Sequence, residues 1–407
     1  MKRKALAIII LLGTVVSIIY FKNINDDYGF VGTYIDGEYV SNIPSKDDGY
    51  VVEKIVCDNE AVGEWNYDDW GILVKNMTKK SKCNVYFRKG IKLADTITLV
   101  DTSGKCPTVN SDGTVNVTNV ESENSLLCSA PDNYGNSYYF RGNVQNNYVY
   151  FANLYWRIIR INGDGSIRMI YDGTTPHENG EASEDRIIGT SAFNEKHSDN
   201  AHVGYMYGTP RASTYEETHV NINDSTIKKY VDNWYENNLK NEVNEKYMSD
   251  NPFCNNRQIS NYKPDNYTNL GYGTEATSYL WLFNKTNPTI KCVQKNDAFT
   301  TSNSKISNGD LKYSIGIISV DEVSLAGGYL SSNKQYYLYT GTYIWTMTPM
   351  DFDSGGSANV RRISDEGAIN GSYDDVYFAH GVKPVINLKA GSLTKGDGLI
   401  SNPYRIS

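Results

Sequence analysis

Short apolar runs separated by turn residues extend over much of the second half of the chain. The clearest pair is the run Tyr155–Ile161 and the returning run Ser166–Tyr171, joined by the glycine-rich stretch Asn162–Gly165. Two such runs on either side of a tight turn are typical of a β-hairpin. Residues 148–154 form a further strand-like run just before it. We therefore predict antiparallel strands in this part of the chain.

One segment instead has the period of a helix. Ser225 precedes apolar residues spaced i, i+3, i+4 and i+7, a spacing that places them on one face of an α-helix: Ile227, Tyr230, Val231 and Trp234. A serine in front of such a run is a preferred N-cap. The polar stretch before it, residues 173–224, has no sustained period, and we expect loops or an insertion there.

The last hundred residues or so return to strand patterns around one short helix. A strand over residues 313–318 leads into Ser319, which with Glu322 forms a capping-box sequence, and Gly327 and Gly328 would end that helix. Further strand-like runs follow at residues 342–346, 359–363 and 381–388. Strands, a few helices and strands again predict an α+β main domain over residues 130–407.

A smaller β domain is expected at residues 30–90. The runs 33–35 and 38–40 flank Asp36 and Gly37, a strong two-residue hairpin signal. Trp65 and Trp70 fall between two cysteines, where a small domain needs aromatic bulk in its core. Residues 91–129 are rich in Ser, Thr, Asn and Asp and are expected to be a spacer.

The first residues form a candidate membrane segment. Lys2, Arg3 and Lys4 precede an uncharged run from Ala5 to Phe21, about 25 Å long if helical. We expect residues 1–22 to be an uncleaved transmembrane helix, with a cleaved signal peptide or a buried helix as alternatives. The basic residues would stay in the cytoplasm, which predicts a single-pass cell-membrane protein with most of the chain outside the cell.

Composition narrows the class of partner. The 407 residues carry a net charge of -8, and with the leading basic residues set aside the rest is more acidic still. An acidic body disfavours nucleic acid as a partner, because phosphate contacts need clustered Lys and Arg. The 33 tyrosines against 11 phenylalanines suit recognition surfaces, although tyrosine also packs in cores.

Cysteine usage agrees with export. The six cysteines all lie beyond the apolar run, and none forms the closely spaced pair of zinc or redox motifs. Disulfides are therefore expected. Of the 15 possible connectivities, we predict the nearest-neighbour one: Cys57 with Cys83, Cys106 with Cys128, and Cys254 with Cys292.

The order of motifs near the C-terminus resembles a known family. A strand and the helix start at residues 317–323, then Tyr343–Pro349, then Gly381–Val385 are similar to the closing half of bacterial C-type lectin-like domains. These include sulfatase-modifying-factor-like domains and surface proteins of Gram-positive bacteria, some with a small Cys/Trp domain. The resemblance implies a C-type lectin-like fold over residues 130–407 and ligand binding at a variable hairpin. The family's calcium-binding strings and C-terminal catalytic cysteines are absent, and Lys383 replaces an arginine.

Catalytic chemistry has little support in the sequence. The five histidines form no metal-binding motif, and no nucleophile elbow or nucleotide-binding loop occurs. Four carboxylates, Asp351, Asp353, Asp374 and Asp375, lie in one stretch, but solvated loop charges are the commoner explanation. We expect no metal, no cofactor and no enzyme activity.

The stretch from Asp351 to Ala379 is the best candidate site, because it mixes aromatic rings with short polar side chains between strands. Our interpretation is an extracellular binding protein or adhesin that recognises a glycan or a host or matrix protein. The alternatives are an exported enzyme acting on cell-wall or glycan substrates and a self-assembling envelope protein. The predicted ligand-binding residues are Tyr343, Trp345, Asp353, Asn359, Arg361, Tyr373 and Asp374.

Overall fold

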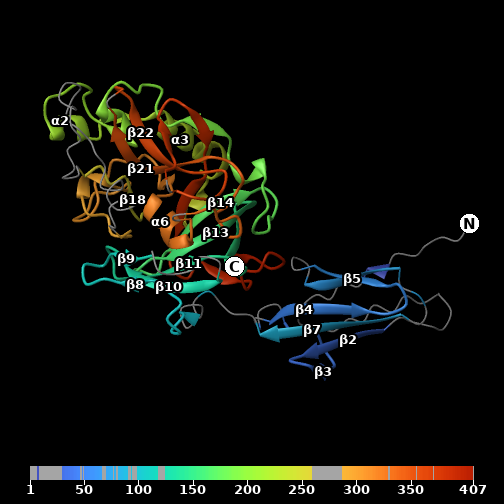
Figure 1. Ribbon diagram of the computed structural model, residues 1–407. Coiled ribbons are helices and arrows are strands. Elements are labelled where there is room, and N and C mark those ends of the chain that lie inside the picture. The colour runs from blue at the N-terminus through green and yellow to red at the C-terminus, as the bar shows by residue number, and fades with distance from the viewer. Residues whose placement is uncertain are drawn as a thin grey trace, which may run out of the picture. The chain divides into compact units, whose positions relative to one another are not determined.

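The structure is a computed structural model, and contacts between its residues divide the chain into two compact units. Unit 1 comprises residues 1–95 and 395–397, and unit 2 comprises residues 96–394 and 398–407. Figure 1 shows the strands of both units. The structure describes residues 7–8, 30–45, 48, 50–66, 70–76, 78, 81–89, 93, 99–117, 124–258, 287–328, 331–353, 355–369 and 371–406.

Unit 1 consists of β-strands in two sheets. The larger sheet has the order β3-β2-β7-β4, in which β2 and β7 are parallel. The smaller sheet has the order β1-β6-β5. The strands are β1 (Ala7–Ile8), β2 (Phe30–Ile35), β3 (Glu38–Val40), β4 (Tyr50–Cys57), β5 (Val62–Asn66), β6 (Gly71–Lys75) and β7 (Lys82–Lys89). The hairpin predicted around Asp36 and Gly37 is confirmed, and both turn residues have the positive φ that such a turn requires.

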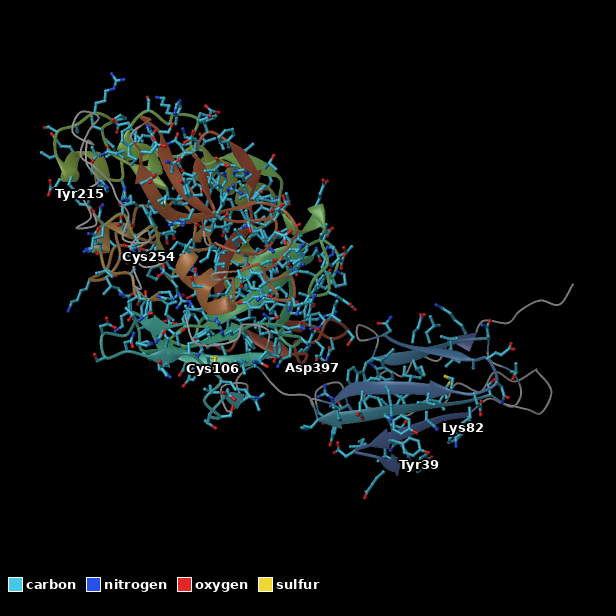
Figure 2. The ribbon with its side chains drawn as sticks, in the orientation of Figure 1. Tyr39, Lys82, Cys106, Tyr215, Cys254 and Asp397 are labelled. Atoms are coloured by element: carbon cyan, nitrogen blue, oxygen red, sulfur yellow. A yellow bond between two sulfur atoms is a disulfide. The ribbon has the colours of Figure 1, made fainter. Side chains whose placement is uncertain are left out.

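The core of unit 1 follows from alternation along β7. Cys83, Val85 and Phe87 point inward and are buried. The rings of Trp65 and Trp70 lie edge to face at 5.4 Å, and Trp65 lies 5.1 Å from Phe87, so both tryptophans pack in or against the core. The outward face of the sheet carries Tyr39 and Lys82, which Figure 2 labels.

Unit 2 is built around a nine-stranded sheet. Its main path is β20-β25-β14-β13-β12-β27-β26, with β11 also paired to β13 and β10 paired to β11. β12 and β27 are parallel, with Val149 opposite Tyr404. The strands are β10 (Leu126–Pro131), β11 (Asn136–Arg141), β12 (Tyr148–Phe151), β13 (Leu154–Ile161), β14 (Ile167–Gly173), β20 (Ile315–Ile317), β25 (Pro384–Leu388), β26 (Leu393–Lys395) and β27 (Tyr404–Ile406).

A five-stranded sheet in unit 2 has the order β15-β24-β21-β22-β23. Its strands are β15 (Thr190–Ala192), β21 (Ile344–Phe352), β22 (Ala358–Ile363), β23 (Tyr373–Asp375) and β24 (Ala379–Gly381). Three two-stranded ladders pair β8 (Thr108–Val109) with β9 (Val115–Asn116), β16 (Met206–Tyr207) with β17 (Asn223–Asp224), and β18 (Phe253–Cys254) with β19 (Ala298–Phe299).

Helices in the described part of unit 2 are short, apart from one. They are α2 (Tyr215–His219), α3 (Thr226–Asn238), α4 (Glu242–Glu245) and α6 (Val320–Ala326), with 3-10 turns η3 (Glu184–Arg186), η4 (Asn200–Val203) and η5 (Lys295–Asp297). The N-cap predicted at Ser225 is confirmed, since its side chain accepts a hydrogen bond from the Lys228 N–H. The capping box of Ser319 and Glu322 is also confirmed.

The hairpin predicted across the Asn162–Gly165 turn is confirmed as β13 and β14. All three disulfides have the predicted nearest-neighbour pairing. The expected spacer, residues 91–129, contains β8 and β9, and β10 of the main sheet begins within it at Leu126.

The prediction of an α+β fold headed by a transmembrane helix is wrong. Strands are the predominant regular structure of the described residues, and no helix among them is long and apolar enough to cross a membrane. Of the apolar run 5–21, only Ala7–Ile8 lies within the described residues, and it forms β1, paired with Leu73 and Val74 of β6. Isoleucine and valine, which are frequent in this run, have a high strand propensity as well as a high hydropathy.

Lys383, which replaces the arginine of the resembling family, has a structural partner in the core. Its Nζ lies 3.1 Å from Oδ1 of Asp172, which Arg186 also pairs with at 2.9 Å. All three side chains are buried. Burial lowers the pKa of Lys383 to about 8. This ion group joins β14, the residue before β25 and η3.

Candidate functional site

The residues predicted to bind a ligand all lie on or beside the five-stranded sheet, but its register divides them between two faces. Trp345 lies opposite Arg362 and Asp374 opposite Val360, whereas Tyr373 lies opposite Arg361. Directly opposed residues of neighbouring strands share a face, and consecutive residues alternate. Trp345 and Asp374 therefore belong to one face, which we call the Asp374 face. Asn359, Arg361 and Tyr373 belong to the other, the Asn359 face.

On the Asp374 face, polar groups satisfy one another. Oδ2 of Asp374 lies 3.0 Å from Nε2 of His380 and 3.5 Å from Nε of Arg362. The Arg362 guanidinium lies 3.8 Å from the ring centroid of Tyr343. Burial lowers the pKa of His380. Trp345 is fully buried, its Nε1 donates to the Ser191 carbonyl at 3.0 Å, and its ring lies 4.6 Å from that of His380.

On the Asn359 face, carboxylates gather around one amide. Nδ2 of Asn359 donates to Asp351 at 2.8 Å and to Asp353 at 3.2 Å. Burial raises the pKa of Asp351, and burial together with the charge of Asp353 raises the pKa of Asp375. Within the part of the chain that the structure describes, no group of acidic, histidine or cysteine side chains has a geometry that could hold a metal ion.

Arg361 and Asn359 are buried, so they can only support a ligand site from within. The Arg361 guanidinium lies 5.8 Å from the ring centroid of Tyr373. Tyr373 and Tyr343 are the exposed members of the predicted set, and they belong to different faces. The seven residues thus do not form a single contact surface.

An exposed group of rings lies next to the Asn359 face. The rings of Tyr377 and Phe378 are 4.4 Å apart, and the ring of His197 lies 4.9 Å from Tyr377. Tyr377 and Phe378 are each 42% exposed. We call these three residues the aromatic patch. It is continuous with the Asn359 face, because Ser357 contacts both His197 at 3.2 Å and Asp375.

The contacts of Ser357 do not have the arrangement of a catalytic triad. In a triad, the histidine lies between the serine and the carboxylate, which orients the imidazole and stabilises its positive form. Here the serine lies between His197 and Asp375. The arrangement fixes the His197 ring beside Tyr377, and it suits positioning of the patch better than acyl transfer.

Sequence reasoning selected Tyr373 and Asp374 but not the patch residues. The signal was present, because Tyr377 and Phe378 are consecutive bulky rings within the predicted segment. Both residues lie in the turn between β23 and β24, and turns run over the protein surface. His197 is distant in sequence, and no local pattern connects it with this segment.

No family model, no curated protein and no solved structure matches this chain. The resemblance to C-type lectin-like domains therefore stays a prediction.

Proposed function

We propose that the protein is an exported, non-catalytic binding protein that recognises a neutral glycan through the aromatic patch. The observation that carries this proposal is the pair Tyr377 and Phe378, two adjoining rings that are each 42% exposed beside a row of hydrogen-bonding side chains. Export is supported by the cysteines, because all six form disulfides, which persist in oxidising compartments.

The chemistry of the patch favours a sugar over a protein. A pyranose has an apolar face, which stacks on an aromatic ring, and a rim of hydroxyl groups. Hydroxyl groups can donate to the half-buried carboxylates Asp353 and Asp375 next to the rings. Two exposed rings suit one or two sugar units, whereas a stable protein interface buries about 1,200 Å² or more. The carboxylates also disfavour acidic sugars.

Binding of the purified full chain to an array of neutral and acidic glycans tests the proposal. Neutral glycans should bind. Tyr377→Ala and Phe378→Ala should each weaken binding by about tenfold, because each removes one ring on which a sugar can stack. The reference magnitude is the stacking of a nucleobase on an aromatic side chain, which contributes about 1–3 kcal/mol. Tyr39→Ala, which removes an exposed tyrosine of unit 1, is the matched control and should leave binding unchanged.

Three outcomes would contradict the proposal. Cleavage of a bound glycan would favour the exported enzyme, and self-association without ligand would favour the envelope protein. Binding of a protein ligand that survives both patch substitutions would place recognition elsewhere. A chelator should have no effect on glycan binding, because the proposal needs no metal ion.

A further inference from the structure

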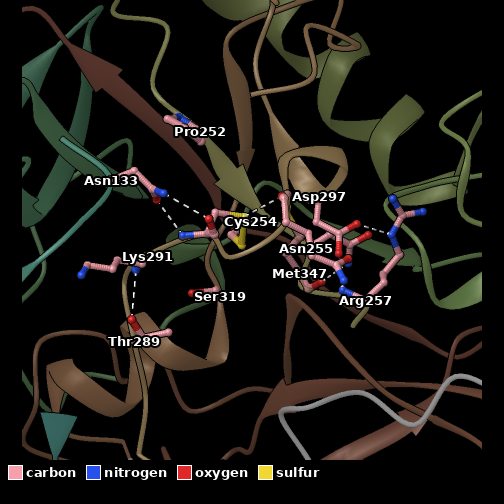
Figure 3. Close-up of a disulfide and its surroundings, with 12 residues drawn as sticks. Asn133, Pro252, Cys254, Asn255, Arg257, Thr289, Lys291, Asp297, Ser319 and Met347 are labelled. Atoms are coloured by element: carbon pink, nitrogen blue, oxygen red, sulfur yellow. Dashed lines mark hydrogen bonds and ion pairs between the residues drawn. A yellow bond between two sulfur atoms is a disulfide. The ribbon is translucent and has the colours of Figure 1, made fainter. Parts of the chain in front are cut away.

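Unit 2 contains a polar cleft away from the five-stranded sheet. Its lining comes from the β10–β11 turn, the β13–β14 hairpin, the segments 251–256 and 289–292, and the start of α6. Figure 3 shows one wall, where the Cys254–Cys292 disulfide joins two of these segments. The Asn133 side chain holds this wall to the β10–β11 turn, accepting from the Cys292 N–H at 2.7 Å and donating to its carbonyl at 3.1 Å.

The buried cations of the cleft already have anionic partners. Arg160 pairs with Asp132 and with Glu322, each at 3.2 Å. Arg168 pairs with Glu322 through both carboxylate oxygens. These contacts leave Arg160 and Arg168 committed to structural ion pairs.

Asp321 is the exception among the carboxylates of the cleft. It is buried, and it accepts a hydrogen bond from the Thr289 N–H at 2.9 Å. No cation of the described residues forms an ion pair with it. Burial, with the neighbouring charge of Glu322 as a further contribution, raises its pKa to about 7. A positive charge placed in the cleft would offset the cost of burying this carboxylate.

Two residues that line the cleft also have buried amide oxygens without partners. Oδ1 of Asn162 and Oδ1 of Asn251 are buried and accept no hydrogen bond from the described residues. Both residues are more than nine-tenths buried. Their amide nitrogens are in use: Asn162 donates to Ser166 and Asn387, and Asn251 donates to Asp164 at 2.8 Å. Since buried acceptors are almost always paired in native proteins, these oxygens indicate a donor-bearing ligand.

We propose that this cleft binds a primary ammonium group, carried by an amino sugar or a lysine side chain. An ammonium has one positive charge, which would pair with the Asp321 carboxylate, and three N–H donors for acceptors of the lining. Tyr134, half exposed among the lining residues, can cover the carbon chain next to the ammonium. This inference is independent of the aromatic patch.

Calorimetric titration of the full chain with two matched pairs of small probes tests the proposal. The first pair is glucosamine and N-acetylglucosamine, and the second is Nα-acetyl-lysine amide and its Nε-acetylated form. The free amine of at least one pair should bind about tenfold or more tightly than its acetylated partner, and the pair that shows this identifies the source of the ammonium. Equal binding of amine and acetylated probe, or no binding of either amine, overturns the proposal.

Two substitutions locate the site. Asp321→Asn keeps the size of the side chain and its acceptor for Thr289, and it should abolish amine binding. Asn251→Ala removes one of the unpartnered oxygens and should weaken it by about tenfold. Asp365→Asn, at an exposed turn, removes the same charge elsewhere in unit 2 and should have no effect. Near-ultraviolet circular dichroism checks that each variant is folded, and retained amine binding by a folded Asp321→Asn variant overturns the proposal.

The pH dependence gives a further measurement. The affinity of the unsubstituted chain for Nα-acetyl-lysine amide should rise between about pH 6 and about pH 8 as Asp321 ionises, because the lysine amine stays protonated over this range. The other charged groups that line the cleft are Asp132, Arg160, Arg168, Lys291 and Glu322. The unsubstituted chain and the Asp321→Asn variant both contain these groups. If amine affinity still rose with pH in the variant, one of these groups would be the one that titrates, which would contradict the proposed role of Asp321.

Discussion

Nη2 of Arg168 donates a hydrogen bond of 3.1 Å to Oε2 of Glu322, the residue that also closes the capping box of α6. The other oxygen of this carboxylate pairs with Arg160 of the neighbouring strand. One buried anion thus fixes the start of α6 against both strands of the β13–β14 hairpin.

Replacing Glu322 by Gln should lower the free energy of unfolding by about 3–5 kcal/mol, because it leaves the buried Arg168 guanidinium without its anion. Urea unfolding followed by circular dichroism measures this. The matched control is Glu366→Gln, which removes an exposed ion pair with Lys334 and should hardly move the midpoint. If the two variants lost similar free energies of unfolding, the buried ion pairs would not stabilise the fold more than an exposed pair does.

Replacing Cys254 and Cys292 by serine should lower the free energy of unfolding by about 3–4 kcal/mol, since the disulfide restricts the unfolded chain over a separation of 38 residues. The corresponding Cys106/Cys128 variant, with a separation of 22 residues, should lose slightly less. Thermal unfolding with and without reductant provides the measurement. An unchanged midpoint after complete reduction would be inconsistent with this role.

Acid should destabilise the protein through buried neutral histidines. Burial lowers the pKa of His202 to about 4 and that of His219 to about 3, from 6.5. The unfolded chain therefore takes up these protons first, so the stability is complete above about pH 6.5 and is lost as the pH falls towards about 4. His202 alone accounts for up to about 3 kcal/mol.

Unfolding midpoints measured between about pH 7 and about pH 5 test this, with His202→Leu as the variant. Neither ring nitrogen of His202 has a hydrogen-bond partner among the described residues, so leucine should fold and should reduce the pH dependence.

Ser225→Ala should destabilise unit 2 by about 1 kcal/mol, because the Lys228 N–H loses the side chain that caps α3. Lys229→Ala changes an exposed residue of the same helix and should alter stability by less than about 0.5 kcal/mol. Chemical denaturation of both variants gives the comparison. If the lysine variant were the less stable, the cap would not be the stabilising contact.

The sequence was informative where the signal is local. The β13–β14 turn, the Ser225 cap and the Ser319 capping box depend on residues a few positions apart, and the structure confirms them. Long-range pairing left no such signal: the parallel contact between Val149 and Tyr404 joins segments more than 250 residues apart. The apolar run at residues 5–21 predicted a helix, whereas its two described residues, Ala7 and Ile8, form a strand, because hydropathy alone does not distinguish the two.

Local sequence patterns also predict only part of the candidate site. They indicate the segment from Asp351 to Ala379, but they do not indicate on which face of the sheet each of its residues lies. Register shifts in β21, between Trp345 and Pro349 and between Pro349 and Asp351, interrupt simple alternation, so the side of the sheet on which each residue lies could not be counted from the N-terminal end. His197 joins the patch from a distant segment through the fold alone.

The pairing of β12 with β27 also has a consequence for biosynthesis. The main sheet of unit 2 cannot close until residue 405 has been synthesised, although its other partner strands begin at Leu126. Until β27 has been synthesised, β12 has an unpaired edge, which can pair with other chains. Addition of β27 to β12 is therefore a late step in the folding of unit 2.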